Sequence, residues 1–291
     1  MDNPYKDARW TSADGLELYF RDYRGTAEAA SRPPVICLHG LTRNSRDFEL
    51  LAPHIAQQGW RVIVPEMRGR GHSAYAEDSS SYAVPTYIAD LAALLEQEGI
   101  DRFVSIGTSM GGLMTMAMAQ AWPGRIAGAL LNDIGPIVQA DGLTHIRGYL
   151  GQGRSFSTWM HAARALEETH GAAHPGYATE DWIGLAKRTM TLCNNGRIAF
   201  DYDMKIAEPI MAADENAVPP DLWPAFDALA AVPLLLVRGA LSGLLSEETF
   251  AEMQARAPGA DAVTVPGVGH APTLDEPEAR AAIDALLARV G

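Results

Sequence analysis

The sequence predicts an α/β fold in which a mostly parallel central sheet is flanked by helices. Short runs rich in β-branched residues alternate with helical patterns, at residues 35–38, 61–64, 103–106, 126–131, 234–237 and 262–265. These runs are almost continuously apolar, which is typical of strands buried on both faces of a parallel sheet. A turn at Asp14-Gly15, followed by alternating apolar and polar residues as far as residue 23, predicts an antiparallel hairpin at one edge.

The alternation of strands and helices is interrupted once. Residues 136–226 contain three tryptophans, Trp159, Trp182 and Trp223, helical patterns at 158–169 and 182–193, and no convincing strand. Because this stretch lies between two predicted core strands, we interpret it as an inserted helical cap. The predicted core therefore comprises residues 1–135 and 227–291.

Charge and composition exclude several classes of partner. The chain of 291 residues has a net charge of −13, so we expect it to bind neither nucleic acid nor an anionic membrane surface. The expected partner is a small molecule, and the sequence does not predict an oligomeric state. No group of His, Cys and Asp residues has the spacing of metal ligands, so neither a metal nor another cofactor is expected.

The chain carries no pattern of secretion or membrane insertion. Asp2, Lys6, Asp7 and Arg9 precede no apolar stretch, which argues against a signal peptide, and no apolar run reaches the roughly 20 residues that span a bilayer. The two cysteines, Cys37 and Cys193, do not indicate a disulfide framework. A cytoplasmic protein is expected.

The strongest chemical motif is Gly107-Thr108-Ser109-Met110-Gly111, between a predicted strand and a predicted helix. A sharp strand-to-helix turn needs glycines around the serine, and it lifts the hydroxyl clear of the sheet. We therefore predict that Ser109 is a nucleophile. The backbone N–H of Met110, at the helix N-terminus, and that of Leu41, after the first parallel strand, are the predicted donors of an oxyanion hole.

Of the eight histidines, His270 is the candidate general base. It follows Gly267-Val268-Gly269 on the loop after the last predicted strand, from which it can reach a distant serine. His39 is expected to brace its loop rather than transfer protons. The others are expected to be packing or solvated residues: His54, His72, His145, His161, His170 and His174.

Together these motifs resemble the α/β-hydrolase superfamily, and within it the capped, esterase-like serine hydrolases of bacteria. The motifs are His39-Gly40, Arg-Gly-Arg-Gly-His-Ser at 68–73, the turn at Ser109, Asn-Asp-Ile-Gly-Pro at 132–136, and Gly269-His270. The resemblance covers almost the whole chain, although the cap matches only in general character. It implies an α/β-hydrolase fold and a catalytic triad in which an acid holds the tautomer of the histidine.

The acid is where this chain departs from the family pattern. Similar proteins carry Asp after the serine that here is Ser242, in the loop after the strand 234–237, and this chain has Gly243. Three explanations of the missing acid are open: the acid lies elsewhere in the sequence, the chain is a disabled variant of an enzyme, or the chain was never a catalyst. The best relocated candidate is Asp133, because some members, including certain haloalkane dehalogenases, place their acid after the corresponding strand.

Asp133 also has a structural interpretation, in which it braces the turn near Gly135. Glu247 and Glu248 are weaker candidates for the acid, because both suit the N-terminal dipole of a helix.

The predicted function is hydrolysis of a carboxylic ester or related acyl substrate through an acyl-enzyme on Ser109. Carbon–carbon bond hydrolysis or lactone opening on the same residues is an alternative, and so is a ligand-binding protein with impaired catalysis because of Gly243. The tryptophans and methionines of the cap suggest an apolar acyl or alcohol group in the substrate, although such residues more often serve simple core packing. Arg43 could orient a substrate carboxylate, but we expect it to be an exposed loop residue.

Overall fold

The computed structural model describes residues 3–25, 32–213 and 219–291 of the chain. Two parts of the sequence predictions lie outside the described residues. They are Asp2, one of the charged residues that argue against a signal peptide, and residues 214–218 of the predicted cap. Among the described residues, no helix has both the length and the apolar character needed to cross a membrane.

The core is an eight-stranded sheet, and every predicted strand belongs to it. Across the sheet the strands are β1 (Lys6–Thr11), β2 (Glu17–Tyr23), β4 (Val62–Glu66), β3 (Val35–Leu38), β5 (Phe103–Thr108), β6 (Ile126–Asn132), β10 (Leu234–Gly239) and β11 (Asp261–Val265). β1 and β2 form the predicted antiparallel hairpin, β2 pairs antiparallel with β4, and the remaining neighbours are parallel. The predicted mostly parallel sheet is confirmed.

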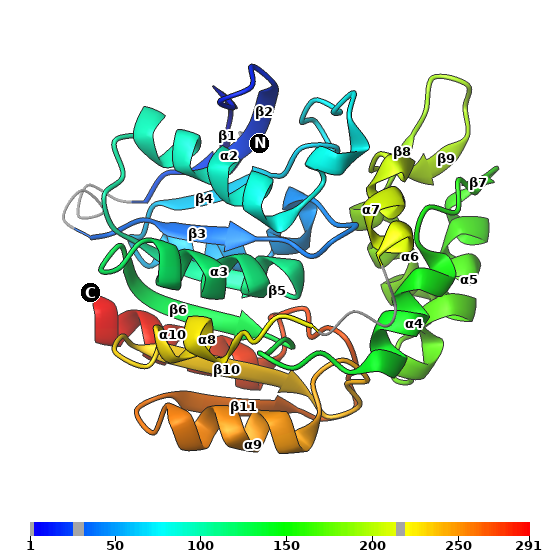
Figure 1. Cartoon of the computed structure of the whole chain (residues 1–291). Helices are drawn as coiled ribbons and strands as arrows, with labels where there is room; N and C mark the ends of the chain where they lie inside the picture. The colour runs from blue at the N-terminus through cyan, green and yellow to red at the C-terminus, as the bar shows by residue number, and fades with distance from the viewer. Residues whose placement is uncertain (1–2, 26–31, 214–218) are drawn as a thin grey trace.

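Helices cover both faces of this sheet, as predicted (Figure 1). One face packs against α2 (Val84–Gln97), α3 (Met110–Ala121), α8 (Trp223–Asp227) and α9 (Glu247–Arg256). The other face packs against α1 (Leu51–Gln57) and α10 (Pro277–Val290).

The strand β3 shows why the apolar runs form buried strands. Ile36 and Leu38 point into the cluster on the α3 face, whereas Val35 and Cys37 point into the cluster on the α10 face. All four residues are fully or almost fully buried. Because successive side chains of a strand alternate between faces, a strand covered on both sides must be apolar at every position.

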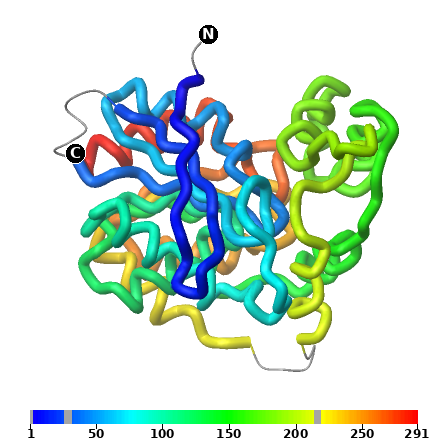
Figure 2. The backbone as a smooth tube through the Cα atoms, turned by 90° about the horizontal axis from the view of Figure 1, so that it is seen from above, coloured from blue at the N-terminus to red at the C-terminus, as the bar shows by residue number. Residues whose placement is uncertain are grey.

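The segment between β6 and α8 forms a separate layer beside the carboxyl edge of the sheet, which we call the cap segment (Figures 1 and 2). Its helices are α4 (Ala140–Tyr149), α5 (Trp159–His170), α6 (Thr179–Thr189) and α7 (Ala207–Ala212). α5 and α6 share a hydrophobic cluster of their own, which includes Trp182, Leu166 and Leu185. The predicted boundary at residue 226 falls within α8, and α8 packs against α3 of the core.

The expectation that this segment contains no strand is wrong. Three short strands, β7 (Ser155–Phe156), β8 (Met190–Leu192) and β9 (Ile198–Phe200), form a small antiparallel sheet in the order β7, β9, β8. The helix predicted at 182–193 accordingly spans Thr179–Thr189 and gives way to β8. Strands of two or three residues are too short to show a period of two, and pairing with distant segments decides their conformation.

Candidate functional site

A cavity of about 700 Å³ lies between the carboxyl edge of the sheet and the cap segment. Ser109 and His270 line it from the core, and His170 and Tyr149 line it from the cap segment. Ligand sites of parallel α/β sheets collect at the carboxyl ends of the strands, where loops from neighbouring strands converge.

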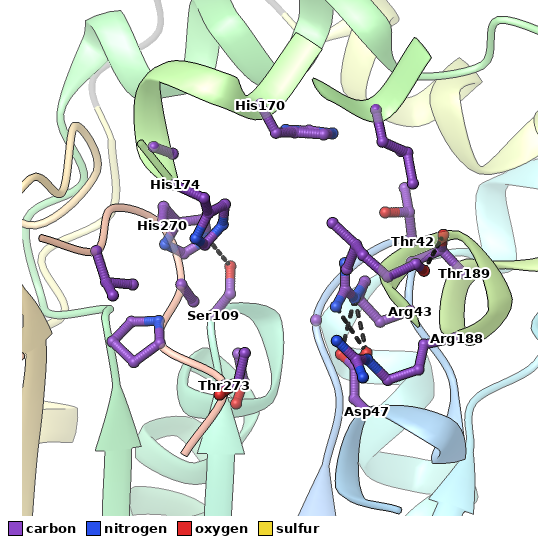
Figure 3. A pocket seen from close by; sticks show the side chains of 18 of the residues that line it. Thr42, Arg43, Asp47, Ser109, His170, His174, Arg188, Thr189, His270 and Thr273 are labelled. Carbon is purple, nitrogen blue, oxygen red and sulfur yellow. Dashed lines mark hydrogen bonds and ion pairs between the residues drawn. The ribbon is translucent and has the colours of Figure 1, made fainter. Parts of the chain in front are cut away.

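Ser109 lies at a strained turn between β5 and α3. Its φ of 52° lies in the left-handed region, which is unusual for a residue with a side chain. A Cβ at Gly107 would come within 2.4 Å of the carbonyl oxygen of Gly111, and a Cβ at Gly111 within 2.2 Å of that of Leu38. Glycine is required at both positions, as the motif predicts, and the turn brings the Ser109 hydroxyl into the cavity (Figure 3).

The structure brings Ser109, His270 and Asp133 together in one line of hydrogen bonds. The Nε2 atom of His270 lies 2.9 Å from Ser109 Oγ, and its Nδ1 atom lies 2.8 Å from Asp133 Oδ2. These residues are separated by 24 and 137 positions in the chain, and three different strand ends place them. His270 is partly exposed to the cavity, whereas the Asp133 side chain is fully buried.

Asp133 is held rigidly by the neighbouring strand β10 and its loop. Its backbone N–H donates to the carbonyl of Val237, and its φ of 55° is again left-handed. Oδ1 accepts a 2.8 Å hydrogen bond from the N–H of Gly239, and Oδ2 accepts a 2.7 Å hydrogen bond from Ser242 Oγ. With His270, three donors therefore stabilise the buried carboxylate.

Sequence reasoning missed the role of Ser242. It stands immediately before Gly243, in the loop that carries the acid in similar proteins, and its hydroxyl binds the carboxylate supplied by β6 instead. The signal was present in the sequence as a serine beside the position of the missing acid.

Neither Gly243 nor the two alternative acids, Glu247 and Glu248, takes the place of Asp133 beside His270. Gly243 lines the cavity, and a Cβ there would meet nothing within 4 Å. Glu247 is 80% exposed and lies 3.6 Å from Arg238, and Glu248 is exposed in the first turn of α9. Both glutamates therefore have the helix N-terminal position that the sequence indicated.

Leu41 and Met110 flank Ser109 from two different segments. In the described part of the chain, neither backbone N–H donates a hydrogen bond. Arg70, which is fully buried, contacts both residues: its Nε donates to the carbonyl of Leu41 at 2.9 Å, and its Nη2 lies 3.8 Å from Met110 Sδ. Within the described residues, neither of these two N–H groups is committed to a protein acceptor.

His39 braces its loop, as expected. Its Nε2 accepts a 3.1 Å hydrogen bond from the N–H of Met67, so its Nδ1 carries the proton donated to the carbonyl of Gly40 at 2.7 Å. Burial, together with the charge of Arg70, lowers the pKa of His39 to about 4. A neutral imidazole with both nitrogens committed has no free atom for proton transfer.

Polar side chains from the cap segment line much of the cavity. His145, His170 and Tyr149 pack edge to face, with ring centroids 5.0 to 6.1 Å apart, and all three border the cavity. His174 also lines it, stacked on Tyr177 at 4.5 Å. The packing expected of these histidines is therefore present, but it takes place at the wall of the cavity.

The apolar residues of the cap serve core packing, and the expectation for Arg43 is corrected. No tryptophan or methionine of the described residues lines the cavity, because Trp159 and Trp182 pack in the cap cluster and Trp223 packs against Phe226. Arg43 is not an exposed loop residue: its side chain is 29% exposed, lines the cavity and forms an ion pair with Asp47. Among the described residues, no group of three or more His, Cys, Asp or Glu side chains is arranged to hold a metal ion.

Comparisons with known proteins agree with this architecture. A family model described as alpha/beta hydrolase fold matches residues 33–277. The 3-hydroxybutyrate-oligomer hydrolase of Cupriavidus necator is 34% identical over 266 residues, which cover 89% of this chain and 90% of that protein. An esterase of Mycobacterium tuberculosis is 27% identical over 256 residues, or 86% of this chain and 80% of that protein.

A solved structure extends the similarity over the full length. The crystal structure of an alpha/beta hydrolase from Novosphingobium aromaticivorans is 58% identical in sequence and superimposes with a TM-score of 0.94. The match covers 100% of this chain and 100% of that chain.

Proposed function

The chain belongs to the α/β-hydrolase family, and from that premise we propose that it is a serine hydrolase that cleaves carboxylic esters through an acyl-enzyme on Ser109. The observation that carries the proposal is the line of hydrogen bonds from Ser109 through His270 to Asp133 at the wall of a ligand-sized cavity. A nucleophile, a base and an orienting acid are what acyl transfer requires.

In the proposed first step, His270 removes the proton of Ser109 as the hydroxyl oxygen attacks the ester carbonyl. Asp133 holds the proton-bearing Nδ1 of His270, so Nε2 faces the serine as the acceptor. The imidazolium that forms is stabilised by the buried carboxylate. It then protonates the leaving alcohol, and a water molecule activated by the same histidine releases the acid and restores Ser109.

Charge on the tetrahedral intermediate is assigned to the N–H groups of Leu41 and Met110. Met110 begins α3, so its N–H also contributes the positive end of the helix dipole. Arg70 is a positioning residue in this proposal, because it contacts both segments and so keeps their separation constant.

The relatives support ester hydrolysis over carbon–carbon bond cleavage. A 3-hydroxybutyrate oligomer is a chain of ester bonds, and the hydrolase named for it matches nine-tenths of its own length to this chain. The alternative of a ligand-binding protein with impaired catalysis depends on the lack of an acid at Gly243, and the carboxylate of Asp133 beside His270 argues against it. Lactones contain the same acyl bond and belong in the same substrate screen.

The test is hydrolysis of p-nitrophenyl butyrate by the purified chain and its Ser109→Ala variant. We expect measurable turnover by the parent and a loss of about 10⁴-fold or more in kcat for Ser109→Ala. Labelling by a fluorophosphonate should follow the same pattern, because it requires the activated serine. Ser80→Ala, at an exposed serine, is the control. Equal turnover by the parent and Ser109→Ala would refute the proposal.

A further inference from the structure

One wall of the cavity is built from Arg43, Asp47 and Arg188, and it lies across the cavity from Ser109 and His270 (Figure 3). We call these three residues the cationic wall. Arg43 Nε lies 2.8 Å from both oxygens of Asp47, and its Nη2 lies 2.8 Å from Oδ1. Within the described residues, no hydrogen bond uses Nη1 of Arg43. Asp47 thus fixes the guanidinium while leaving one edge for a ligand.

The cationic wall holds two guanidinium groups and one partly buried carboxylate. The ion pair of Arg188 is with Glu49, at 3.6 Å. Glu49 is 41% exposed, so solvent screens that pair. The cationic wall therefore has a net positive charge on the side of the cavity.

The other carboxylates at the cavity are solvated or already bonded. Asp275 pairs with Arg280, and Asp181 accepts the N–H of Ala178. Oε1 of Glu276 accepts two hydrogen bonds from Thr273, whereas its buried Oε2 has no partner among the described residues. Asp141 is exposed. None of these acids is buried against the guanidinium of Arg43, so they do not cancel its charge locally.

The histidines of the opposite wall add hydrogen-bonding atoms without adding charge. Burial, reinforced by the charge of Arg43, lowers the pKa of His170 to about 3 and that of His174 to about 4. His174 is only 7% exposed, and its Nδ1 has no hydrogen-bond partner among the described residues. A buried polar atom without a partner, in a side chain that borders a cavity, is an atom whose bonding a ligand or an ordered water can complete.

We propose that this cavity selects esters that carry a carboxylate group, which Arg43 binds while His174 hydrogen-bonds a polar atom of the same substrate. The inference rests on the proposed ester hydrolysis and names its substrate class. A planar carboxylate matches the free edge of a fixed guanidinium, and its single charge matches the net charge of the cationic wall.

Two matched pairs of esters test the proposal. Monomethyl glutarate and dimethyl glutarate differ in charge on the acyl side, whereas 3-(butyryloxy)propanoate and its methyl ester differ on the alcohol side. The readout is the ratio of kcat/KM for the charged ester to that for its neutral partner, measured by proton release. The parent should prefer the charged member of at least one pair. The pair that shows the preference identifies whether Arg43 binds a carboxylate on the acyl side or on the alcohol side of the ester.

Arg43→Gln should lower that ratio by about 10- to 100-fold, the size expected for a lost charge-assisted hydrogen bond. The ratio for Arg43→Lys should lie between those of the parent and Arg43→Gln, because a lysine keeps the positive charge but not the paired N–H donors of a guanidinium. His174→Phe keeps a ring on Tyr177 and should raise KM for the charged ester several-fold. Arg256→Gln is the matched control, because Arg256 lies in the last turn of α9, pairs with Asp227 and does not line the cavity.

Binding separates this proposal from the proposed hydrolysis. Monomethyl and dimethyl glutarate are titrated by calorimetry into Ser109→Ala and into Ser109→Ala with Arg43→Gln. Weaker binding of only the charged ester in the double variant supports the carboxylate site even if the parent hydrolyses no ester. An equal preference for both esters in the parent, or an equal loss for both in Arg43→Gln, would overturn it.

Discussion

The loops after β6 and β10 end side by side at the carboxyl edge of the sheet, and both reach the Nδ1 side of His270. The β6 loop supplies the carboxylate of Asp133, whereas the β10 loop supplies the hydroxyl of Ser242 and the N–H of Gly239, both bound to that carboxylate. In similar proteins the β10 loop carries the acid, at the position of Gly243. The comparison teaches that, in the proposed triad, the position of the carboxylate beside His270 matters more than the strand that supplies it.

The largest effect should come from removing the carboxylate of the β6 loop. We expect Asp133→Asn to lower kcat for p-nitrophenyl butyrate by about 10⁴-fold with little change in KM, because the amide no longer fixes the reactive tautomer of His270. Circular dichroism and urea unfolding confirm that the variant folds. A loss below 10-fold would show that Asp133 only braces the turn.

Moving the acid to the β10 loop should recover part of this activity. In the Asp133→Asn background, Gly243→Asp should raise kcat by about 10- to 100-fold, since a Cβ at Gly243 meets nothing within 4 Å and so leaves room for the side chain. Gly259→Asp in the same background is the matched control, because that glycine also lies in open space but is remote from the cavity. Equal recovery, or none, would mean that position 243 cannot reach His270.

Ser242→Ala tests the contribution of the β10 loop in the native arrangement. The variant loses one of three donors to Asp133, so we expect kcat to fall by about 10-fold, the effect of one hydrogen bond to a charged group. The same change in the Asp133→Asn background should have a much smaller effect. Additive losses in this double-mutant cycle would show that Ser242 acts independently of Asp133.

The loop after β3 carries a histidine with a different role from that of His270: both ring nitrogens of His39 are hydrogen-bonded to the backbone. His39 has a folded pKa of about 4 against about 6.5 in an unfolded chain, so between these values only the unfolded chain binds the proton. Acidification through this range therefore destabilises the protein. The slope for this residue approaches, but does not exceed, about 1.4 kcal/mol per pH unit midway between the two pKa values.

His39→Gln should remove that part of the pH dependence. From pH 6.5 to pH 5.5, the free energy of unfolding measured in urea should fall by about 1 kcal/mol less in the variant than in the parent, because the unfolded histidine is half protonated at the start of this interval. His170 and His174 have lowered pKa values and add a slope of the same sign, so the variant should keep a residual dependence. Identical slopes in both proteins would contradict the assignment.

Local patterns predicted the strands and helices of the core because their signals lie in consecutive residues. The apolar runs at β3 and β5 and the glycines around Ser109 specify a buried strand and a sharp turn without reference to distant residues. The short strands β7, β8 and β9 carry no such signal. These strands form by pairing with one another: Phe156 of β7 and Leu192 of β8 both pair with Ile198 of β9. β7 and β9 are far apart in the chain, so local sequence patterns do not reveal their pairing.

The sequence by itself determined the α/β family, the nucleophile candidate Ser109 and the base candidate His270, because each depends on a motif that is contiguous in the chain. It favoured Asp133 as the acid over Glu247 and Glu248, but left open whether the chain has an acid at all. Only the tertiary structure placed Asp133 on His270, Ser242 on Asp133 and Arg43 in the cavity. These contacts join side chains from separate strand ends, and their geometry depends on how the sheet and the cap segment pack.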